Sequence, residues 1–120
     1  MGMEINIKRG DILIANLEPI KGHEQAGIRP VLVIQNDLQN QYSPVIIIAA
    51  ITSKIFDKEY PTNVLISKNE SGLNKDSTIL LNQIRTIDKK RVVKKVGSLN
   101  NFIMKKVDLA IRISLGLDGF

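Results

Sequence analysis

The sequence predicts a mostly β protein with some α structure (α+β): a small, SH3-like antiparallel β-barrel with an amphipathic helix at its C-terminus. Three observations lead to this class. At 120 residues the chain has the commonest length of a single domain, so we expect one domain spanning residues 1–120. Five or six short stretches have the character of β-strands and are separated by polar turns. Only the last part of the chain changes to a helical spacing of apolar residues.

The first two predicted strands flank a long polar loop. Residues 12–17 are nearly apolar, and residues 31–36 form a second buried strand. The polar loop between them has roughly ten residues, which is longer than the usual hairpin turn, and it contains the only histidine, His23. Long loops in compact domains are commonly binding loops. Because Pro30 restricts Arg29 to an extended backbone, we expect Arg29 to be held in place at the strand start.

The middle of the chain alternates strands with polar connections. Residues 45–52 are continuously apolar and β-branched, as in a central strand buried on both faces, and they end in the hydroxyl residue Thr52. Short strands joined by turns are what suggests an antiparallel barrel. Further strands are expected at residues 63–66, 78–84 and 92–97, the last as an edge strand protected by lysines, with polar turns or loops at 37–43, 54–61 and 68–77.

Residues 100–115 form the predicted helix. Asn100 is a suitable N-cap, since its side chain can accept a hydrogen bond from a free N–H of the first turn. Charged residues lie outside the apolar stripe, so we expect the stripe to pack on the sheet. The residues on this stripe are Ile103, Val107, Ala110, Ile111 and Ser114.

Composition limits the possible functions. The formal net charge of +5 favours polyanionic partners, nucleic acid above all, although a merely soluble basic surface is an alternative. The chain has no cysteine, one histidine and no carboxylate spacing typical of a metal site, so we predict neither a metal nor a cofactor. The longest apolar run, residues 45–51, is too short to span a bilayer, and no leader precedes the fold. We therefore predict a cytoplasmic protein without a membrane partner.

Catalysis without a bound metal suits one reaction particularly well. No nucleophile elbow, phosphate-binding loop or dinucleotide motif is present in the sequence. Single-stranded RNA carries its own nucleophile, the ribose 2′-hydroxyl. Its cleavage needs only a base for that proton, an acid for the 5′-oxygen and positive charge around the phosphorus.

Five blocks of the sequence, taken together, resemble one known family. They are Lys8-Arg9-Gly10-Asp11, Gly22-His23-Glu24-Gln25, Arg29-Pro30-Val31-Leu32-Val33-Ile34-Gln35-Asn36, Ala50-Ile51-Thr52 and Gln83-Ile84-Arg85-Thr86-Ile87-Asp88. In this order and spacing they resemble the MazF/PemK family of toxin–antitoxin endoribonucleases, and most closely the MazF enzymes of Gram-positive bacteria. The resemblance runs from about residue 8 to the C-terminal helix.

The resemblance implies both a fold and an activity. The fold is a CcdB/PemK-type barrel that acts as a homodimer. The activity is sequence-specific, metal-independent cleavage of single-stranded mRNA, which leaves a 2′,3′-cyclic phosphate and a 5′-hydroxyl, and a MazE-type antitoxin neutralises it. Two other functions stay open because one fold serves several purposes: a CcdB-like gyrase-binding toxin without nuclease activity, and a non-catalytic SH3-like RNA-binding module.

Three catalytic residues are implied by the resemblance. Arg29 matches the arginine that contacts the scissile phosphate, and the guanidinium fork can bond two oxygens. Thr52 matches the threonine whose hydroxyl bonds the same phosphate. A surface ion pair and a strand cap are the structural alternatives for these two residues. His23 matches a histidine used in acid–base chemistry; if it only binds, Arg29 or an assisted water is the base. Asn82 replaces a carboxylate of several relatives and cannot be a base.

Four further residues match polar positions near the family's RNA groove. Gln25, Ser53, Gln83 and Arg85 are expected to bind the substrate by reading base edges or holding the backbone, with purely structural roles as the alternative. The basic cluster of residues 89–95 is expected to attract RNA or an acidic antitoxin tail, with a solvated face as the alternative.

Overall fold

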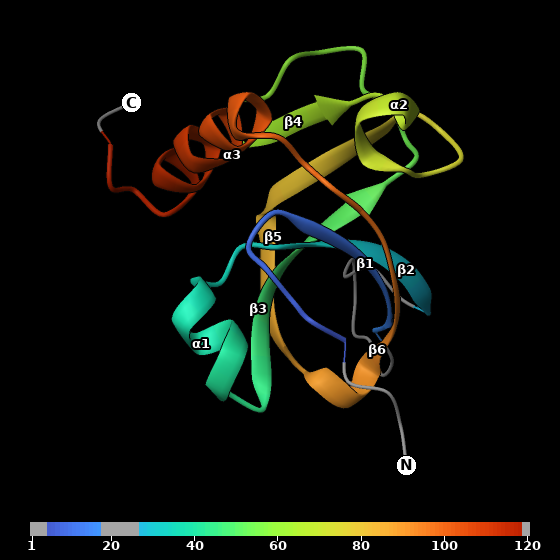
Figure 1. Cartoon of the computed structure of the whole chain (residues 1–120). Coiled ribbons are helices and arrows are strands. Elements are labelled where there is room, and N and C mark those ends of the chain that lie inside the picture. The colour runs from blue at the N-terminus through green and yellow to red at the C-terminus, as the bar shows by residue number, and fades with distance from the viewer. Residues whose placement is uncertain (1–4, 18–26, 119–120) are drawn as a thin grey trace.

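The computed structural model describes residues 5–17 and 27–118 (Figure 1). Within these ranges six strands form one antiparallel sheet in the order β4-β5-β3-β2-β1-β6. The predicted α+β class is therefore confirmed. The strands are β1 (Asp11–Asn16), β2 (Ile28–Val33), β3 (Val45–Thr52), β4 (Asn63–Ile66), β5 (Ser77–Asp88) and β6 (Val92–Ser98); the helices are α1 (Asp37–Tyr42), α2 (Lys68–Ser71), α3 (Asn101–Ser114) and the 3₁₀ turn η1 (Lys89–Arg91).

The sheet curves but is not closed into a barrel, which corrects the barrel part of the SH3-like fold predicted from the sequence. Among the described residues no backbone pairing joins the edge strands β4 and β6. The chain leaves β4 after only four residues and turns into α2, which contacts β6 instead. Two glycines allow this close approach: a Cβ on Gly72 would collide with the Val96 carbonyl, and one on Gly97 with the Ser71 carbonyl.

Each face of the sheet has its own apolar core. On one face Leu32, Ala49 and Ile51 pack with residues of α3, which covers that side of β4 and β5 (Figure 1). On the other face Val31 and Ile48 belong to a second cluster with residues of β1 and β5. Side chains alternate between the faces, so β3 supplies both cores. This confirms that residues 45–52 form a central strand buried on both sides.

Helix α3 confirms the predicted amphipathic helix. The Asn100 side chain accepts a hydrogen bond from the Ile103 N–H at 2.9 Å, as expected of an N-cap. Within the predicted stripe, Ile103, Val107 and Ala110 are buried, while Ile111 and Ser114 are half-buried. Met104 is also buried and extends the stripe beyond the residues expected from spacing alone.

Two predicted polar connections contain short helices. In residues 37–43, α1 is capped by Asn36, whose side chain accepts from the Gln39 N–H. In residues 68–77, α2 begins with a capping box formed by Ser67 and Glu70. Neither helix is long enough to show apolar periodicity, so the capping residues are the signal that was overlooked. Strand β5 also continues beyond the expected residue 84 to Asp88.

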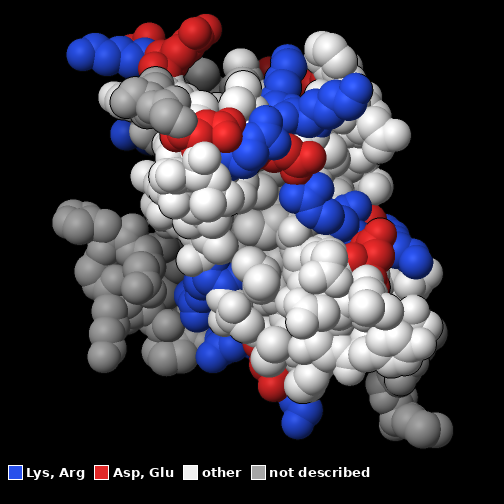
Figure 2. All heavy atoms as spheres, turned by 90° about the vertical axis from the view of Figure 1, so that its left-hand side faces the viewer, with Lys and Arg blue, Asp and Glu red and all other residues white. Residues whose placement is uncertain are grey.

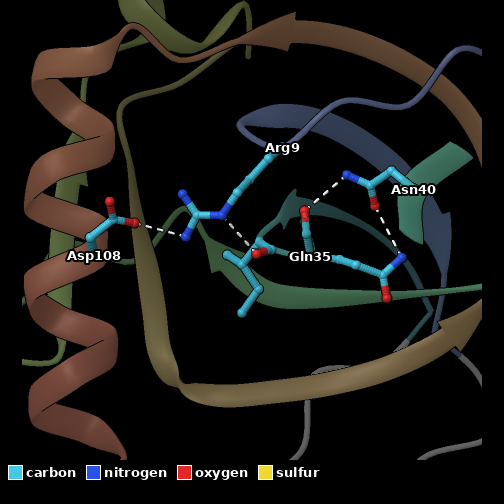
Figure 3. Close-up of polar contacts among 5 residues, drawn as sticks. Arg9, Gln35, Asn40 and Asp108 are labelled. Atoms are coloured by element: carbon cyan, nitrogen blue, oxygen red, sulfur yellow. Dashed lines mark hydrogen bonds and ion pairs between the residues drawn. The ribbon is translucent and has the colours of Figure 1, made fainter. Parts of the chain in front are cut away.

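A cluster of polar side chains joins the N-terminal turn to α1 and α3 (Figure 3). Arg9 Nε donates to the Ile34 carbonyl at 2.8 Å, and its Nη2 donates to Asp108 Oδ1 at 2.7 Å. The side chains of Gln35 and Asn40 are buried and bond each other at 3.1 Å. We call Arg9, Gln35, Asp37, Asn40 and Asp108 the polar framework.

Asp37 connects the two halves of the polar framework. Its Oδ1 accepts the Arg9 backbone N–H at 2.6 Å and Asn40 Nδ2 at 3.1 Å. The bond from the Arg9 backbone lowers the pKa of Asp37, because it favours the ionised carboxylate. Hydrogen bonds and an ion pair among the residues of the polar framework therefore hold α1 and α3 against the sheet.

Candidate active site

Arg29 and Thr52 lie at neighbouring strand ends. In the β2–β3 pair, Val31 stands opposite Ala50. Continuing this register by two residues brings Arg29 and Thr52 to corresponding positions, although the pairing itself stops at Val31. Alternation along the two strands directs both side chains to the face that carries Val31 and Ile48. Arg29 is exposed and Thr52 is half-buried. An exposed cation beside a hydroxyl is a suitable arrangement for contacting a phosphate.

The Thr52 side chain has a structural contact of its own. Its Oγ1 accepts a hydrogen bond from the Lys54 N–H at 3.2 Å, so the hydroxyl does help to close the strand. A hydroxyl has one donor proton in addition to its acceptor capacity. Because the contact with Lys54 uses Oγ1 as an acceptor, the proton can still be donated to an anion.

Arg85 has a partner within the protein. It stands opposite Ile48 on β3, and its Nη1 donates to the Leu17 carbonyl at 3.2 Å. Arg91 similarly donates to the Asn16 carbonyl at 3.2 Å. Two guanidinium groups thus hold the carbonyls at the end of β1. For Arg85 this favours the structural alternative over direct substrate binding, although its position opposite Ile48 places it on the same face as Thr52.

A bulge in β5 brings Asn82 and Gln83 next to Thr52. Ala49 pairs with Ile84 but the next residue, Ala50, pairs with Leu80, so residues 81–83 have no partner on β3. Leu81 is buried in the core under α3, Asn82 is exposed and Gln83 is half-buried. A hollow of about 380 Å³, which we call the central hollow, is formed here. Its lining residues are Thr52, Lys54, Phe56, Tyr60, Thr62, Asn63, Leu80, Asn82 and Gln83.

A second hollow adjoins the first and is formed by the β3–β4 loop, residues 53–62. This loop hollow has a volume of about 420 Å³ and shares Phe56, Tyr60 and Asn63 with the central hollow. The rings of Phe56 and Tyr60 meet edge to face, with centroids 5.9 Å apart. The sequence reasoning missed both aromatic residues. The available signal was that two of only five aromatic side chains fall within one charged loop.

The remaining predicted site residues are placed as follows. His23 and Gln25 lie outside the described residues. Ser53 is exposed beside Thr52 but lines neither hollow. Within residues 5–17 and 27–118, no group of three or more His, Cys, Asp or Glu side chains is arranged to hold a metal ion. In the same ranges no helix is both long and apolar enough to cross a membrane.

The predicted basic cluster of residues 89–95 is partly committed to internal contacts. Lys89 Nζ donates to the Asn40 carbonyl at 2.6 Å, and Lys95 forms an ion pair with the buried Asp11 at 3.0 Å. Figure 2 shows the face that bears α1 and α3, where Lys and Arg atoms lie among Asp and Glu atoms in the upper part. In the upper part of this face the charges of both signs therefore lie together, which weakens the attraction of that part for a polyanion.

Comparison with known proteins gives consistent results. Residues 8–115 match the family model described as PemK-like, MazF-like toxin of type II toxin-antitoxin system. The fold is similar to that of MazF from Deinococcus radiodurans, with a TM-score of 0.79 and 24% identity over 94% of this chain and 99% of that one. It is also similar to an endoribonuclease from Mycobacterial species in complex with its cognate antitoxin (TM-score 0.78, 20% identity, 95% and 99% covered). A third similar structure is the Mycobacterium tuberculosis toxin MazF-mt6 (0.76, 23%, 91% and 99%).

Proposed function

This chain belongs to the PemK-like, MazF-like toxin family of type II toxin-antitoxin systems, and from that premise we propose that it is a sequence-specific endoribonuclease that cuts single-stranded mRNA. One observation carries the proposal: Arg29 and Thr52 come to corresponding positions at the ends of β2 and β3, beside the central hollow. Two of the similar structures, an endoribonuclease and a MazF toxin, support this class of activity, and the chain covers nearly all of their length.

The cleavage is an internal transfer of the phosphate. The ribose 2′-hydroxyl gives its proton to a base while its oxygen attacks the phosphorus. The bond from phosphorus to the 5′-oxygen breaks, and that oxygen takes a proton from an acid. The products are a 2′,3′-cyclic phosphate and a 5′-hydroxyl. No atom beyond those of the RNA and the proton-transfer groups is consumed, so the reaction runs without a metal in this proposal.

Arg29 and Thr52 act on the phosphate as its negative charge rises. The guanidinium of Arg29 donates to the two non-bridging oxygens and stabilises the pentavalent transition state. The Thr52 hydroxyl donates its proton to one of the same oxygens while Oγ1 keeps its contact with Lys54. Gln83 and Ser53 hold the nucleotides on either side of the cleaved bond. Arg85, on β5, supports the site by bonding the Leu17 carbonyl at the end of β1.

The reaction also needs a base and an acid. His23 and Gln25 belong to the segment between β1 and β2, and an imidazole titrates in the range that proton transfer at neutral pH requires. We propose His23 as the proton-transfer residue and Gln25 as a substrate-binding residue. A His23→Ala variant with unchanged cleavage would remove His23 from this role and leave Arg29 or a water molecule as the base.

The family also suggests partners and a location. We propose that the chain, as one toxin domain, forms a homodimer in the cytoplasm and is neutralised by a MazE-type antitoxin. The similar structures that contain antitoxin from Mycobacterial species and from Deinococcus radiodurans support the antitoxin partner. Sedimentation of the chain alone and with a co-expressed antitoxin would measure both associations.

One assay tests the proposed activity. Single-stranded RNA is incubated with the protein in excess EDTA, and the ends of the fragments are mapped. We expect cuts at a short sequence, 5′ ends that accept a phosphate directly and 3′ ends closed as cyclic phosphates. Intact RNA, 5′-phosphate ends or a requirement for added Mg²⁺ would contradict the proposal. The Arg29→Ala variant, purified in the same way, controls for contaminating nucleases.

A further inference from the structure

The loop hollow has the properties of a subsite for a single base. We propose that it holds one unstacked nucleobase of the RNA, next to the nucleotides at the cleaved bond, with the ring of Tyr60 as its stacking surface. This inference rests on the proposed function, because it assigns to the same substrate a part of the surface that the phosphate chemistry does not use.

The loop hollow is continuous with the candidate active site. Phe56, Tyr60 and Asn63 line both hollows, and the central hollow extends from these residues to Thr52 and Gln83. An RNA strand whose phosphate lies at Thr52 therefore has a neighbouring nucleotide within reach of Tyr60. Because the loop hollow adjoins the central hollow, a base of the bound RNA can enter it.

Exposed apolar groups line the loop hollow. Tyr60 is 47% exposed, Ile55 51% and Leu65 63%, although each is large and hydrophobic. Such groups gathered in one concave site indicate a binding surface. Single-stranded RNA is typically recognised through unstacked bases that lie against aromatic rings.

Phe56 and Tyr60 have different positions within the loop hollow. Phe56 is half-buried; it meets Tyr60 edge to face, with an angle of 85° between the rings, and Lys54 Nζ lies 4.8 Å from its ring centroid. Phe56 is thus occupied by contacts within the loop. Tyr60 is the exposed ring of the pair, so we assign stacking to Tyr60 and support to Phe56.

The loop is anchored at both ends, so the hollow is present before a ligand binds. Thr78 Oγ1 donates to the Lys54 carbonyl at 2.9 Å near the start of the loop. At its other end the Asn63 N–H bonds the Tyr60 carbonyl at 2.9 Å, and the Leu81 N–H bonds the Thr62 carbonyl at 2.8 Å. A preformed site loses less conformational entropy on binding.

The charges of the loop favour a base over a phosphate. The loop contains two lysines, Lys54 and Lys58, and two carboxylates, Asp57 and Glu59, so its formal charges balance. Lys58 and Glu59 both line the loop hollow. A phosphate or an acidic peptide would gain little from this balance, whereas a neutral, flat base gains from the apolar lining.

The test measures binding rather than cleavage. The probe is a dye-labelled single-stranded RNA that contains the mapped cleavage sequence, with 2′-deoxyribose at the cleaved position to prevent reaction. If no RNA is cut, the proposed function fails, and an RNA selected for binding from a random pool takes the place of this probe. In a parallel series each nucleotide in turn is made abasic, and anisotropy gives the Kd of each RNA.

We expect Tyr60→Ala to weaken binding by roughly tenfold, and one abasic position to weaken binding to the unchanged protein by a similar factor. Combining the two changes should produce no further loss, because both remove the same contact. Tyr60→Phe should restore binding. Tyr42→Ala is the matched control, since Tyr42 is 73% exposed and lines neither hollow.

Several outcomes would overturn the inference. Normal RNA binding by Tyr60→Ala is one. Additive losses from the variant and from every abasic position are another, because they place the base elsewhere. A third is unchanged RNA binding together with weaker binding of an antitoxin peptide, which would assign the loop hollow to an apolar side chain of the antitoxin.

Discussion

The polar framework and the candidate active site use the same residue types in opposite ways. Arg9 directs its guanidinium at Ile34 and Asp108, so its hydrogen bonds join parts of the fold. Arg29 is exposed at a strand end, at the position that corresponds to Thr52, and Thr52 lines the central hollow. Both arginines belong to sequence blocks that resemble the same family. Membership of a sequence block therefore does not by itself distinguish an arginine that joins parts of the fold from one that is proposed to contact the phosphate.

The largest expected effect is on activity at the candidate site. Arg29→Ala and Thr52→Ala should each lower kcat/KM for RNA cleavage by about 100-fold or more, because each removes a donor to the developing negative charge. Neither side chain is buried in a core, so the free energy of unfolding measured by chemical denaturation should stay within about 1.5 kcal/mol of the original, which allows for the Thr52–Lys54 hydrogen bond. Cleavage within a few-fold of normal by either variant would remove that residue from the catalytic set. Arg29→Lys should recover only part of the activity, since it lacks the fork.

The polar framework should respond in the reverse manner. Asn40→Ala removes the partner of the Gln35 side chain and of the Gln35 carbonyl, and should lower the free energy of unfolding by about 1–3 kcal/mol. Cleavage by the folded protein should stay unchanged. Leu38→Ala is the matched control, because Leu38 is an exposed residue of the same helix and should have little effect. A large loss of kcat without loss of stability would contradict the distinction between the two clusters.

Arg85 combines a hydrogen bond within the fold with a position on the face that carries Thr52. Its bond to the Leu17 carbonyl is half-buried, so Arg85→Met should lower the free energy of unfolding by about 1 kcal/mol. Cleavage should fall far less than in Arg29→Ala, and mainly through KM. If cleavage instead fell as far as in Arg29→Ala at unchanged stability, Arg85 would have to be counted among the residues that contact phosphate.

The smallest expected effect concerns acid stability. The folded-state pKa of Asp37 is lowered from its ordinary value of 3.8. A lowered pKa contributes stability that is present above the unfolded-state value and is lost as the pH falls through the folded-state value. Asp37→Asn should therefore flatten the decline in stability below about pH 4, measured by urea unfolding at pH 7 and at successively lower pH. An unaltered acid profile would show that other carboxylates determine it.

Much of the fold could be predicted from the sequence. The β-branched run of residues 45–52 predicts a strand, and the helical spacing of apolar residues from Ile103 onward predicts α3. The short helices α1 and α2 carry no such period and are specified by local caps at Asn36 and Ser67. Barrel closure depends on whether the two edge strands meet. Gly72 and Gly97 let α2 approach β6 closely, and no spacing in the sequence indicates that these two segments are neighbours.

The candidate site was less accessible to sequence reasoning. Arg29 and Thr52 were found through the family resemblance, because nothing in their spacing indicates that their strands are neighbours. The bulge that orients Gln83 is a property of pairing, and pairing requires both strands. Tyr60 was missed because a single aromatic residue in a charged loop belongs to no motif and to no periodic pattern. Its importance follows only from the hollow that it lines.

The three unpaired residues of β5 have an evolutionary consequence. Because the β3 partners on either side, Ala49 and Ala50, are adjacent, removing residues 81–83 would join the two halves of β5 without changing which side chains face which core. The loss would be the buried Leu81 together with Asn82 and Gln83. Because the exposed Asn82 and the half-buried Gln83 have no partner on β3, substitutions at these two positions leave the register between β3 and β5 unchanged. Under the proposed function, substitutions in this segment would change the RNA that is recognised, while the sheet that holds Arg29 and Thr52 would keep its pairing.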